Sequence, residues 1–127
     1  MAISSQSTVL TQSNDAYINV GVTGRLQTFS ASTGTVPINP TNGSFIRIAN
    51  PVGAVTVNFT GIPAGYGTSW QVEVASRGSN AVAFNNIVWD GGSAPTIASG
   101  TNKTVLEFYS WDGGTNVYGA VKFATLA

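Results

Sequence analysis

The chain has 127 residues, enough for one domain, and 43% of them are hydrophobic, enough for a core. Charged residues make up only 8%, against an ordinary share of ~25%, and five basic residues balance five acidic ones. Nucleic-acid binding requires a field of Lys and Arg that displaces counterions from phosphates, and these scattered charges do not supply one. The composition therefore excludes an electrostatic nucleic-acid binder.

Residue types that the chain lacks exclude further functions. Without Cys there are no disulfides, thiol nucleophiles or thiolate metal sites, and without His the commonest general base and transition-metal ligand are missing. No apolar run is long enough to span a membrane. The first residues lack the basic and apolar regions of a signal peptide. We therefore expect no membrane contact, no metal and no cofactor.

Residues 1–15 are polar and rich in Ser, Thr and Gln, which predicts an extended N-terminal arm that becomes ordered only against a partner. Residues 16–127 contain no linker, and we expect them to form a single domain. Within this domain, apolar and polar residues alternate with a period of two, which is typical of strands, and helical periodicity is almost absent. The predicted strands are, in chain order, Tyr17–Thr23, Leu26–Ser30, Phe45–Ala49, Val55–Thr60, Trp70–Val74, Ala81–Phe84, Thr104–Trp111 and Val117–Ala124.

The alternation also predicts which side chains of these strands face the core. The inward-facing residues are Ile18, Val20, Val22, Ile46, Ile48, Val55, Val57, Phe59, Trp70, Val72 and Val74. Turn signals separate the strands at Ser32–Gly34, Asn39–Gly43, Asn50–Gly53, Pro63–Gly67 and Gly78–Asn80. About eight short strands with turns at this spacing predict an all-β fold, namely an antiparallel, jelly-roll-like β-sandwich.

The strand predicted at Thr104–Trp111 differs from the others because both of its faces are largely apolar. One face carries Leu106 and Phe108, and the other carries Val105, Glu107, Tyr109 and Trp111. Either the strand is covered on both sides within the domain, or one face packs against another copy of the chain. A sandwich of this size has little capacity to cover both faces of a sheet. We therefore predict a homotrimer whose interface includes Val105, Tyr109 and Trp111.

A Trp-Asp-Gly-Gly tetrad occurs twice, and we interpret both copies as structural turns rather than as chemical sites. Each is expected to end a strand in a hairpin turn, where Asp bonds the backbone two residues on and the glycines supply positive φ. The Trp ring is expected to cover the glycines of its own turn. The residues concerned are Trp89, Asp90, Gly91 and Gly92 in the first copy, and Trp111, Asp112, Gly113 and Gly114 in the second.

The order of these segments is more specific than either turn. Asn86–Ile97 leads through Gly100–Lys103 to Val105–Tyr109, and Trp111–Gly119 follows. This pattern of turns and aromatic residues, within residues 81–124, resembles the C-terminal β-structured modules of tailed-bacteriophage virion proteins, which include tail-fibre heads and small capsid decoration proteins. The resemblance implies a structural protein of a virus particle, often trimeric, made in the cytoplasm of a bacterial host.

Catalysis has little support in the sequence. Paired carboxylates can cleave glycosidic bonds, but Asp90 and Asp112 lie in predicted turns, and Glu73 and Glu107 lie singly in strands. Asp15 is the remaining carboxylate. No nucleophile elbow, phosphate-binding loop or calcium-loop spacing is present. We therefore expect no enzymatic activity.

Carbohydrate or receptor binding is a stronger alternative, because sugars stack on exposed aromatic faces. The candidates in loops are Tyr66, Trp89, Trp111 and Tyr118. Each of these rings can equally be part of the core or cover a turn.

Among virion roles, we predict a capsid decoration (cement) protein on the capsid surface, because so short a chain has no room for a fibre shaft. The arm is expected to dock Ile3, Val9 and Leu10 into shallow grooves of the major capsid protein or another virion protein. The alternative is a tail-fibre or host-recognition module.

Overall fold

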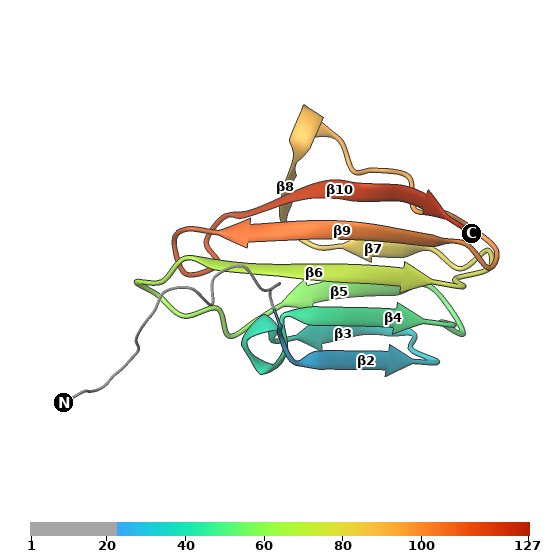
Figure 1. The fold of residues 1–127 in the computed structure, drawn as a ribbon, viewed down its shortest axis with the longest axis horizontal. Coiled ribbons are helices and arrows are strands. Elements are labelled where there is room, and N and C mark those ends of the chain that lie inside the picture. The colour runs from blue at the N-terminus through green and yellow to red at the C-terminus, as the bar shows by residue number, and fades with distance from the viewer. Residues whose placement is uncertain (1–22) are drawn as a thin grey trace.

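The computed structural model describes residues 23–127, which form nine strands and no α-helix. The strands are β2 (Leu26–Ser30), β3 (Gly34–Ile38), β4 (Phe45–Ala49), β5 (Val55–Phe59), β6 (Thr68–Ala75), β7 (Val82–Phe84), β8 (Ile87–Trp89), β9 (Lys103–Ser110) and β10 (Val117–Leu126) (Figure 1). Two short 3-10 turns, η2 (Pro40–Asn42) and η3 (Asp90–Gly92), interrupt the loops. None of the helical turns in this part of the chain is long and apolar enough to cross a membrane.

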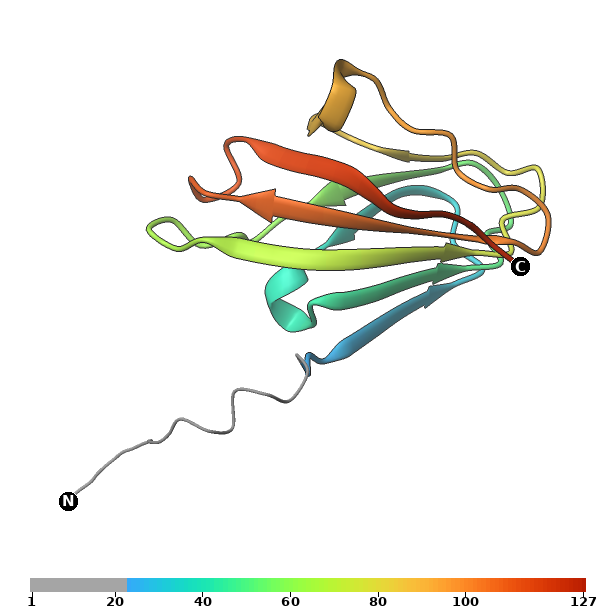
Figure 2. The ribbon, with the colours of Figure 1, turned by 45° about the horizontal axis from the view of Figure 1, so that its top comes forward.

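The strands form two layers, and the chain passes between them repeatedly. One sheet has six strands in the order β2-β4-β6-β9-β10-β8, and the other has three in the order β3-β5-β7. β2, β4 and β6 pair in parallel in the first sheet, while β3, β5 and β7 pair in parallel in the second. Residues 26–84 thus make three coils of a short parallel β-helix, with one strand of each coil in each layer (Figures 1 and 2).

The last part of the chain extends the larger sheet in a different way. β9 pairs antiparallel with the whole of β6, from Thr68 opposite Ser110 to Ala75 opposite Lys103. β10 pairs antiparallel with β9, and β8 adds to β10 in parallel as a short edge strand. An antiparallel hairpin therefore closes the side of the β-helix that β6 leaves open.

The predictions of an all-β fold and of two packed sheets are confirmed for the described residues, but the predicted antiparallel, jelly-roll-like pairing of the strands is wrong. Only the β6–β9 and β9–β10 pairs are antiparallel. Alternation with a period of two places side chains above or below a sheet in the same way whichever direction the neighbouring strand runs. The direction depends on the connections, which here cross from one layer to the other after almost every strand.

Most predicted strands are present, and two strands were missed. Leu26–Ser30 and Phe45–Ala49 match β2 and β4 residue for residue. The missed strands are β3, which contains Gly34 and Pro37, and the three-residue β8. Pro cannot donate to a neighbouring strand, and β3 tolerates it because β3 is an edge strand of its sheet.

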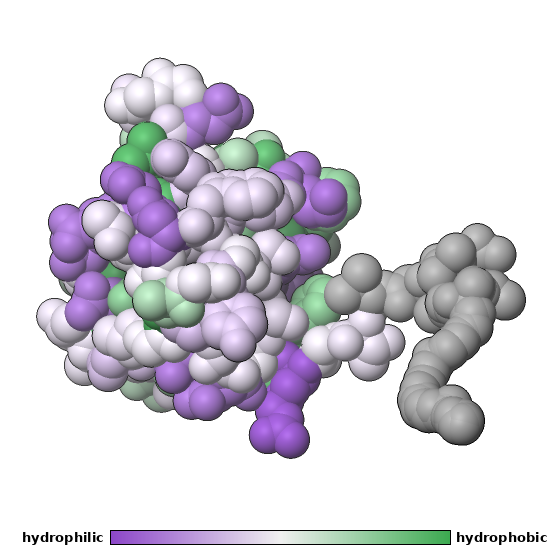
Figure 3. Space-filling model, turned by 90° about the vertical axis from the view of Figure 1, so that its left-hand side faces the viewer, coloured by the Kyte–Doolittle hydropathy of each residue, from purple (hydrophilic) through white to green (hydrophobic). Residues whose placement is uncertain are grey.

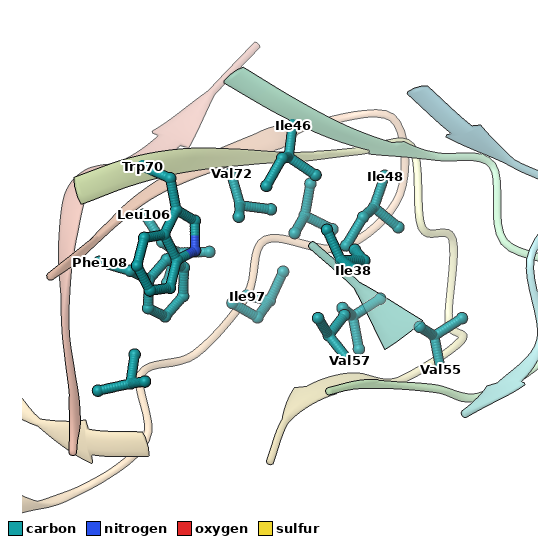
Figure 4. Close-up of a cluster of buried hydrophobic side chains, with 13 residues drawn as sticks. Ile38, Ile46, Ile48, Val55, Val57, Trp70, Val72, Ile97, Leu106 and Phe108 are labelled. Carbon is teal, nitrogen blue, oxygen red and sulfur yellow. The ribbon is translucent and has the colours of Figure 1, made fainter. Parts of the chain in front are cut away.

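The described residues that were predicted to face inward meet between the two layers, together with Ile38, Val82, Leu106 and Phe108. From the six-stranded sheet come Ile46, Ile48, Trp70, Val72, Val74, Leu106 and Phe108, and from the three-stranded sheet come Ile38, Val55, Val57 and Val82 (Figure 4). Phe59 is partly buried against this core. The indole N–H of buried Trp70 has no hydrogen-bond partner among the described residues, and the ring meets Phe59 edge-on at 5.0 Å. Apolar burial is thus the main stabilising term of the domain.

The loop between β8 and β9 completes the core and is held by one arginine. Ile97 in this loop is buried, and Arg77 donates from Nε and a terminal nitrogen to its carbonyl oxygen at 3.1 and 2.8 Å. The same guanidinium reaches the carbonyl oxygens of Ala98 and Asn80. Buried Thr104 accepts a bond from the Ala98 N–H and donates one to the Ala124 oxygen. These hydrogen bonds satisfy backbone N–H and C=O groups that have no partner in a neighbouring strand.

Several sequence predictions lie outside the described residues. The first is the arm at residues 1–15, with Ile3, Val9, Leu10 and the carboxylate Asp15. The second is the strand at Tyr17–Thr23, of which only Thr23 is described, so that its inward residues Ile18, Val20 and Val22 also lie outside.

We expect Arg77→Lys to lower the free energy of unfolding by about 2 kcal/mol, because a lysine cannot reproduce a planar fork that binds several carbonyl oxygens. Urea unfolding followed by tryptophan fluorescence measures the loss. The control is Arg25→Lys at an exposed position, which should change stability little. Equal stability of the two variants would contradict the role assigned to Arg77.

Candidate functional site

The outward faces of the two sheets differ in character. The three-stranded sheet exposes small and polar residues such as Thr35, Pro37 and Thr56. Most exposed large hydrophobic residues lie instead on or beside the outward face of the six-stranded sheet, and these are Leu26, Val88, Tyr109, Trp111, Tyr118, Phe123 and Leu126. The outward face of the six-stranded sheet is therefore the part of the described surface that is most suited to binding.

Strand register brings the aromatic residues of this face into one row. Tyr109 of β9 lies opposite Ser69 of β6 on one side and Tyr118 of β10 on the other, and Tyr118 lies beside Val88 of β8. Neighbouring strands are about 4.8 Å apart, so the row spans roughly 14 Å across four strands. It runs perpendicular to the strands, near the end of the sheet where β9 passes into β10.

Two open hollows follow this row, and Tyr109 lines both. The first, about 330 Å³, lies between β6 and the end of β9, and its walls include Thr68, Ser69 and Trp111. The second, about 260 Å³, lies over β10 and β8, and its walls include Tyr118 and Asp90. We call the two hollows together the Tyr109 groove. Its aromatic walls are accessible, since Trp111 is 75% exposed, Tyr118 44% and Tyr109 41%.

A hydrogen bond holds Tyr109 in place. The Tyr109 hydroxyl donates to Oε1 of Glu107 at 2.6 Å, two residues earlier on the same outward face. This bond and the negative charge of Glu107 raise the pKa of Tyr109 above its ordinary value. The tyrosine hydroxyl is the donor in this bond, which restrains the ring between the two hollows.

The second Trp-Asp-Gly-Gly tetrad forms the β9–β10 hairpin turn and positions Trp111. Oδ1 of Asp112 accepts the backbone N–H of Asn116 at 2.9 Å, and Oδ2 accepts the side-chain amide of the same residue. The Ser110 hydroxyl accepts the N–H of Gly114 at 2.8 Å. The prediction of a structural turn is therefore supported here, although Asp112 bonds the backbone four residues on rather than two.

The glycines of this turn are covered by another loop and not by Trp111. A Cβ on Gly113 would lie 2.9 Å from Cα of Ala64, and one on Gly114 would lie 3.2 Å from Cβ of Ile62. Both glycines have positive φ, as predicted. The turn thus packs against the loop between β5 and β6, and Trp111 is left exposed. Figure 3 shows the end of the molecule where these loops lie, with hydrophobic residues in small separate groups.

The first tetrad is not a hairpin, and this prediction is wrong. Trp89 ends β8, Asp90–Gly92 form η3, and a long loop leads on to β9. Gly91 and Gly92 have positive φ, but a Cβ on either would meet no atom within 4 Å. The ring of Trp89 packs inward, 5.8 Å from the ring of Phe108, and covers Gly119 of β10 rather than its own turn.

The residues predicted for self-association are not all in one place. Tyr109 and Trp111 line the Tyr109 groove, but Val105 lies four residues earlier on β9, in a separate hollow with Arg47 and Phe123. β9 is central in its sheet, with Leu106 and Phe108 buried and Tyr109 exposed, so it is not covered on both sides by the described residues.

Of the described carboxylates, Glu73 and Glu107 are diagonal neighbours on the outward face of β6 and β9, whereas Asp90 and Asp112 lie in separate turns. Glu73 pairs with Arg47 at 2.7 Å, Glu107 binds Tyr109, and Asp112 binds Asn116. Within residues 23–127 no three His, Cys, Asp or Glu side chains gather as a metal site.

Of the predicted sugar-stacking candidates, Trp111 and Tyr118 lie in the Tyr109 groove, Trp89 lies beneath one of its hollows, and Tyr66 is exposed in the β5–β6 loop. Sequence reasoning missed Tyr109 as the centre of a groove, although its place on an apolar outward face pointed to binding. It also missed Thr68 and Ser69, which carry no sequence signal of their own.

Comparison of the chain with protein-family models, with curated protein sequences and with solved structures finds no match in any of the three. The function therefore has to be argued from the fold and the surface.

We expect Gly113→Ala to destabilise the domain more than Gly91→Ala. Both substitutions place a side chain at positive φ, which costs about 1–2 kcal/mol. Only at Gly113 does the new Cβ also collide with backbone, that of Ala64. Urea unfolding of both variants measures the difference, and equal losses would show that the packing of the two loops contributes nothing.

Asp112 should make stability depend on pH in the acid range. Its bonds from Asn116 lower its pKa below 3.8, so the stabilisation is present above that pH and is lost as pH falls through the lowered folded value. Melting temperatures of the wild type and Asp112→Asn, measured from pH 6 to pH 2, should differ most near neutral pH and converge in acid. A constant difference would contradict this assignment.

Proposed function

We propose that the protein is a structural component of a bacteriophage virion, bound to the capsid surface as a decoration (cement) protein that bridges neighbouring shell subunits. The resemblance of residues 81–124 to virion modules is one support. A second is the domain itself, in which the described residues form one continuous apolar core between two sheets and no group of three metal-binding side chains.

The observation that carries the proposal is that the described part of the chain enters the domain at an edge strand, β2, of the six-stranded sheet. Residues preceding β2 join the domain at one edge of the six-stranded sheet, whereas β9, β10 and β8 form the other half of that sheet. Because β2 lies three strands from β9, a domain anchored at its β2 edge leaves the Tyr109 groove free, although both lie at the same end of the sheet. This arrangement suits a protein with one side on a shell and the other facing outward.

Low charge determines the kind of docking that we expect. With a net charge of zero, long-range steering toward the shell is weak. Docking should then be driven by shape and by burial of apolar residues such as Ile3, Val9 and Leu10, and it should depend only weakly on salt.

A tail-fibre or host-recognition module is the second candidate, and the Tyr109 groove is the observation that favours it. Three accessible aromatic side chains in one groove are unusual for a protein whose only role is to pack against a shell. A homotrimer through Val105, Tyr109 and Trp111 stays a prediction. Since Val105 lies in a separate hollow, such an interface would have to cover the length of β9.

Particles lacking this protein should lose resistance to heat and low salt, because each bridging copy resists internal genome pressure. Particles carrying a version deleted for Ser4–Ser13 should show the same defect, since the arm supplies the anchor. Infectivity after heating measures the resistance, and electron microscopy of purified particles locates the protein. If both preparations keep wild-type resistance but fail to adsorb to cells, host recognition replaces the cement function.

A further inference from the structure

We propose that the Tyr109 groove is a binding site for neutral oligosaccharides. This inference goes beyond the cement function and does not depend on it, because it concerns a groove on the half of the sheet opposite the proposed anchor.

The lining combines the two kinds of group that sugars need. Sugars present flat C–H faces that pack on aromatic rings, and hydroxyl groups at their edges that require hydrogen-bond partners. Tyr109, Trp111 and Tyr118 supply aromatic surface across β9 and β10. Ser69, which is exposed beside Tyr109, brings a hydroxyl group to the first hollow, and Asp90 forms part of the wall of the second. A site with only the aromatic residues would favour an apolar partner instead.

Shape favours an oligosaccharide over a single sugar. The two hollows lie on either side of β9 and share the ring of Tyr109, so a ligand that fills both crosses that ring. The row of residues beneath them spans roughly 14 Å, which accommodates more than one sugar ring. Both hollows are open to solvent at their sides, so a chain can extend beyond them.

The charge of the residues that line the groove favours neutral glycans over anionic ones. None of the described residues that line the two hollows is Lys or Arg, and Asp90 brings negative charge to the second hollow. Glu107 adds a carboxylate next to Tyr109. A sialylated, sulfated or uronic-acid glycan would be repelled by these carboxylates without gaining a cationic partner. The groove should therefore prefer neutral sugars.

Local structure restrains Tyr109 and the hairpin that carries Trp111 before any ligand binds. The bond to Glu107 holds Tyr109, and the turn bonds of Asp112 and Ser110 hold the hairpin that carries Trp111. The hairpin in turn packs on Ile62 and Ala64 of a neighbouring loop. Because these bonds restrain the side chains before a ligand binds, less conformational entropy is lost on binding. A bound ligand would also cover the apolar ring of Trp111, whose exposure to water is otherwise unfavourable.

The test uses the purified full chain on an array of neutral and anionic oligosaccharides, the latter sialylated, sulfated or rich in uronic acids. We expect binding to neutral glycans only. For a glycan bound on the array, titration should change the tryptophan fluorescence of the wild type. Trp111→Ala and Tyr118→Ala should each weaken binding at least about tenfold, which is typical of truncating an aromatic anchor. Because both side chains are exposed, their melting temperatures should stay unchanged.

Tyr66→Ala is the matched control, since Tyr66 is an aromatic residue that is 66% exposed but does not line either hollow. It should bind like the wild type. The inference is overturned if the array shows no binding, if only anionic glycans bind, or if Trp111→Ala binds as well as the wild type. It is also overturned if sedimentation shows a trimer that Trp111→Ala converts to a monomer, because the groove would then be a subunit interface.

These outcomes are separate from those of the particle experiment. Loss of heat resistance without the protein supports the cement function whether or not the purified chain binds a glycan. Array binding supports the groove wherever in the particle the protein sits.

Discussion

The ring of Phe108 joins the parts of this domain that the backbone alone would leave separate. It lies 4.9 Å from the ring of Phe59 and 5.2 Å from that of Phe84, both in the three-stranded sheet. It also lies 5.9 Å from Trp70 in β6 and 5.8 Å from Trp89 in β8. Aromatic pairs at such separations stabilise a core beyond their area of burial. The β-helix, the C-terminal hairpin and the edge strand β8 therefore share one aromatic cluster.

The surface of the six-stranded sheet depends on this cluster. Because Phe108 points inward, its neighbours Glu107 and Tyr109 on β9 point outward, and the same alternation on β10 places Tyr118 outward next to Tyr109. A shift of β9 by one residue against β6 would bury Tyr109 and expose Phe108. The aromatic core thus sets the register of β9 against β6, and this register forms the Tyr109 groove. The rings of the core itself are not exposed enough to bind a ligand alone.

Few charged side chains contribute to the stability of this fold, and those that do interact only with neighbouring groups. The exposed pair of Arg47 and Glu73 is of the kind that contributes little to stability. Arg77 and Gln27 instead donate to backbone oxygens in loops, with Gln27 binding the carbonyl oxygens of Asn39 and Gly43. A nearly uncharged surface carried by a closely packed β-helix suits a protein that acts by shape and contact. The cement and glycan-binding proposals both rest on that property.

The sequence by itself determined seven of the nine described strands and, within them, the side that faces the core. The alternation in Phe45–Ala49 and Val55–Phe59 is a property of the single strand, so Ile46, Ile48, Val55 and Val57 were predicted inward and are buried. Only the tertiary structure decided strand direction, because parallel and antiparallel neighbours require the same alternation. It also separated the two tetrads, since Trp89 packs against Phe108 while Trp111 is exposed. The surroundings of a ring come from strands that are distant in the sequence, and identical local motifs carry no information about them.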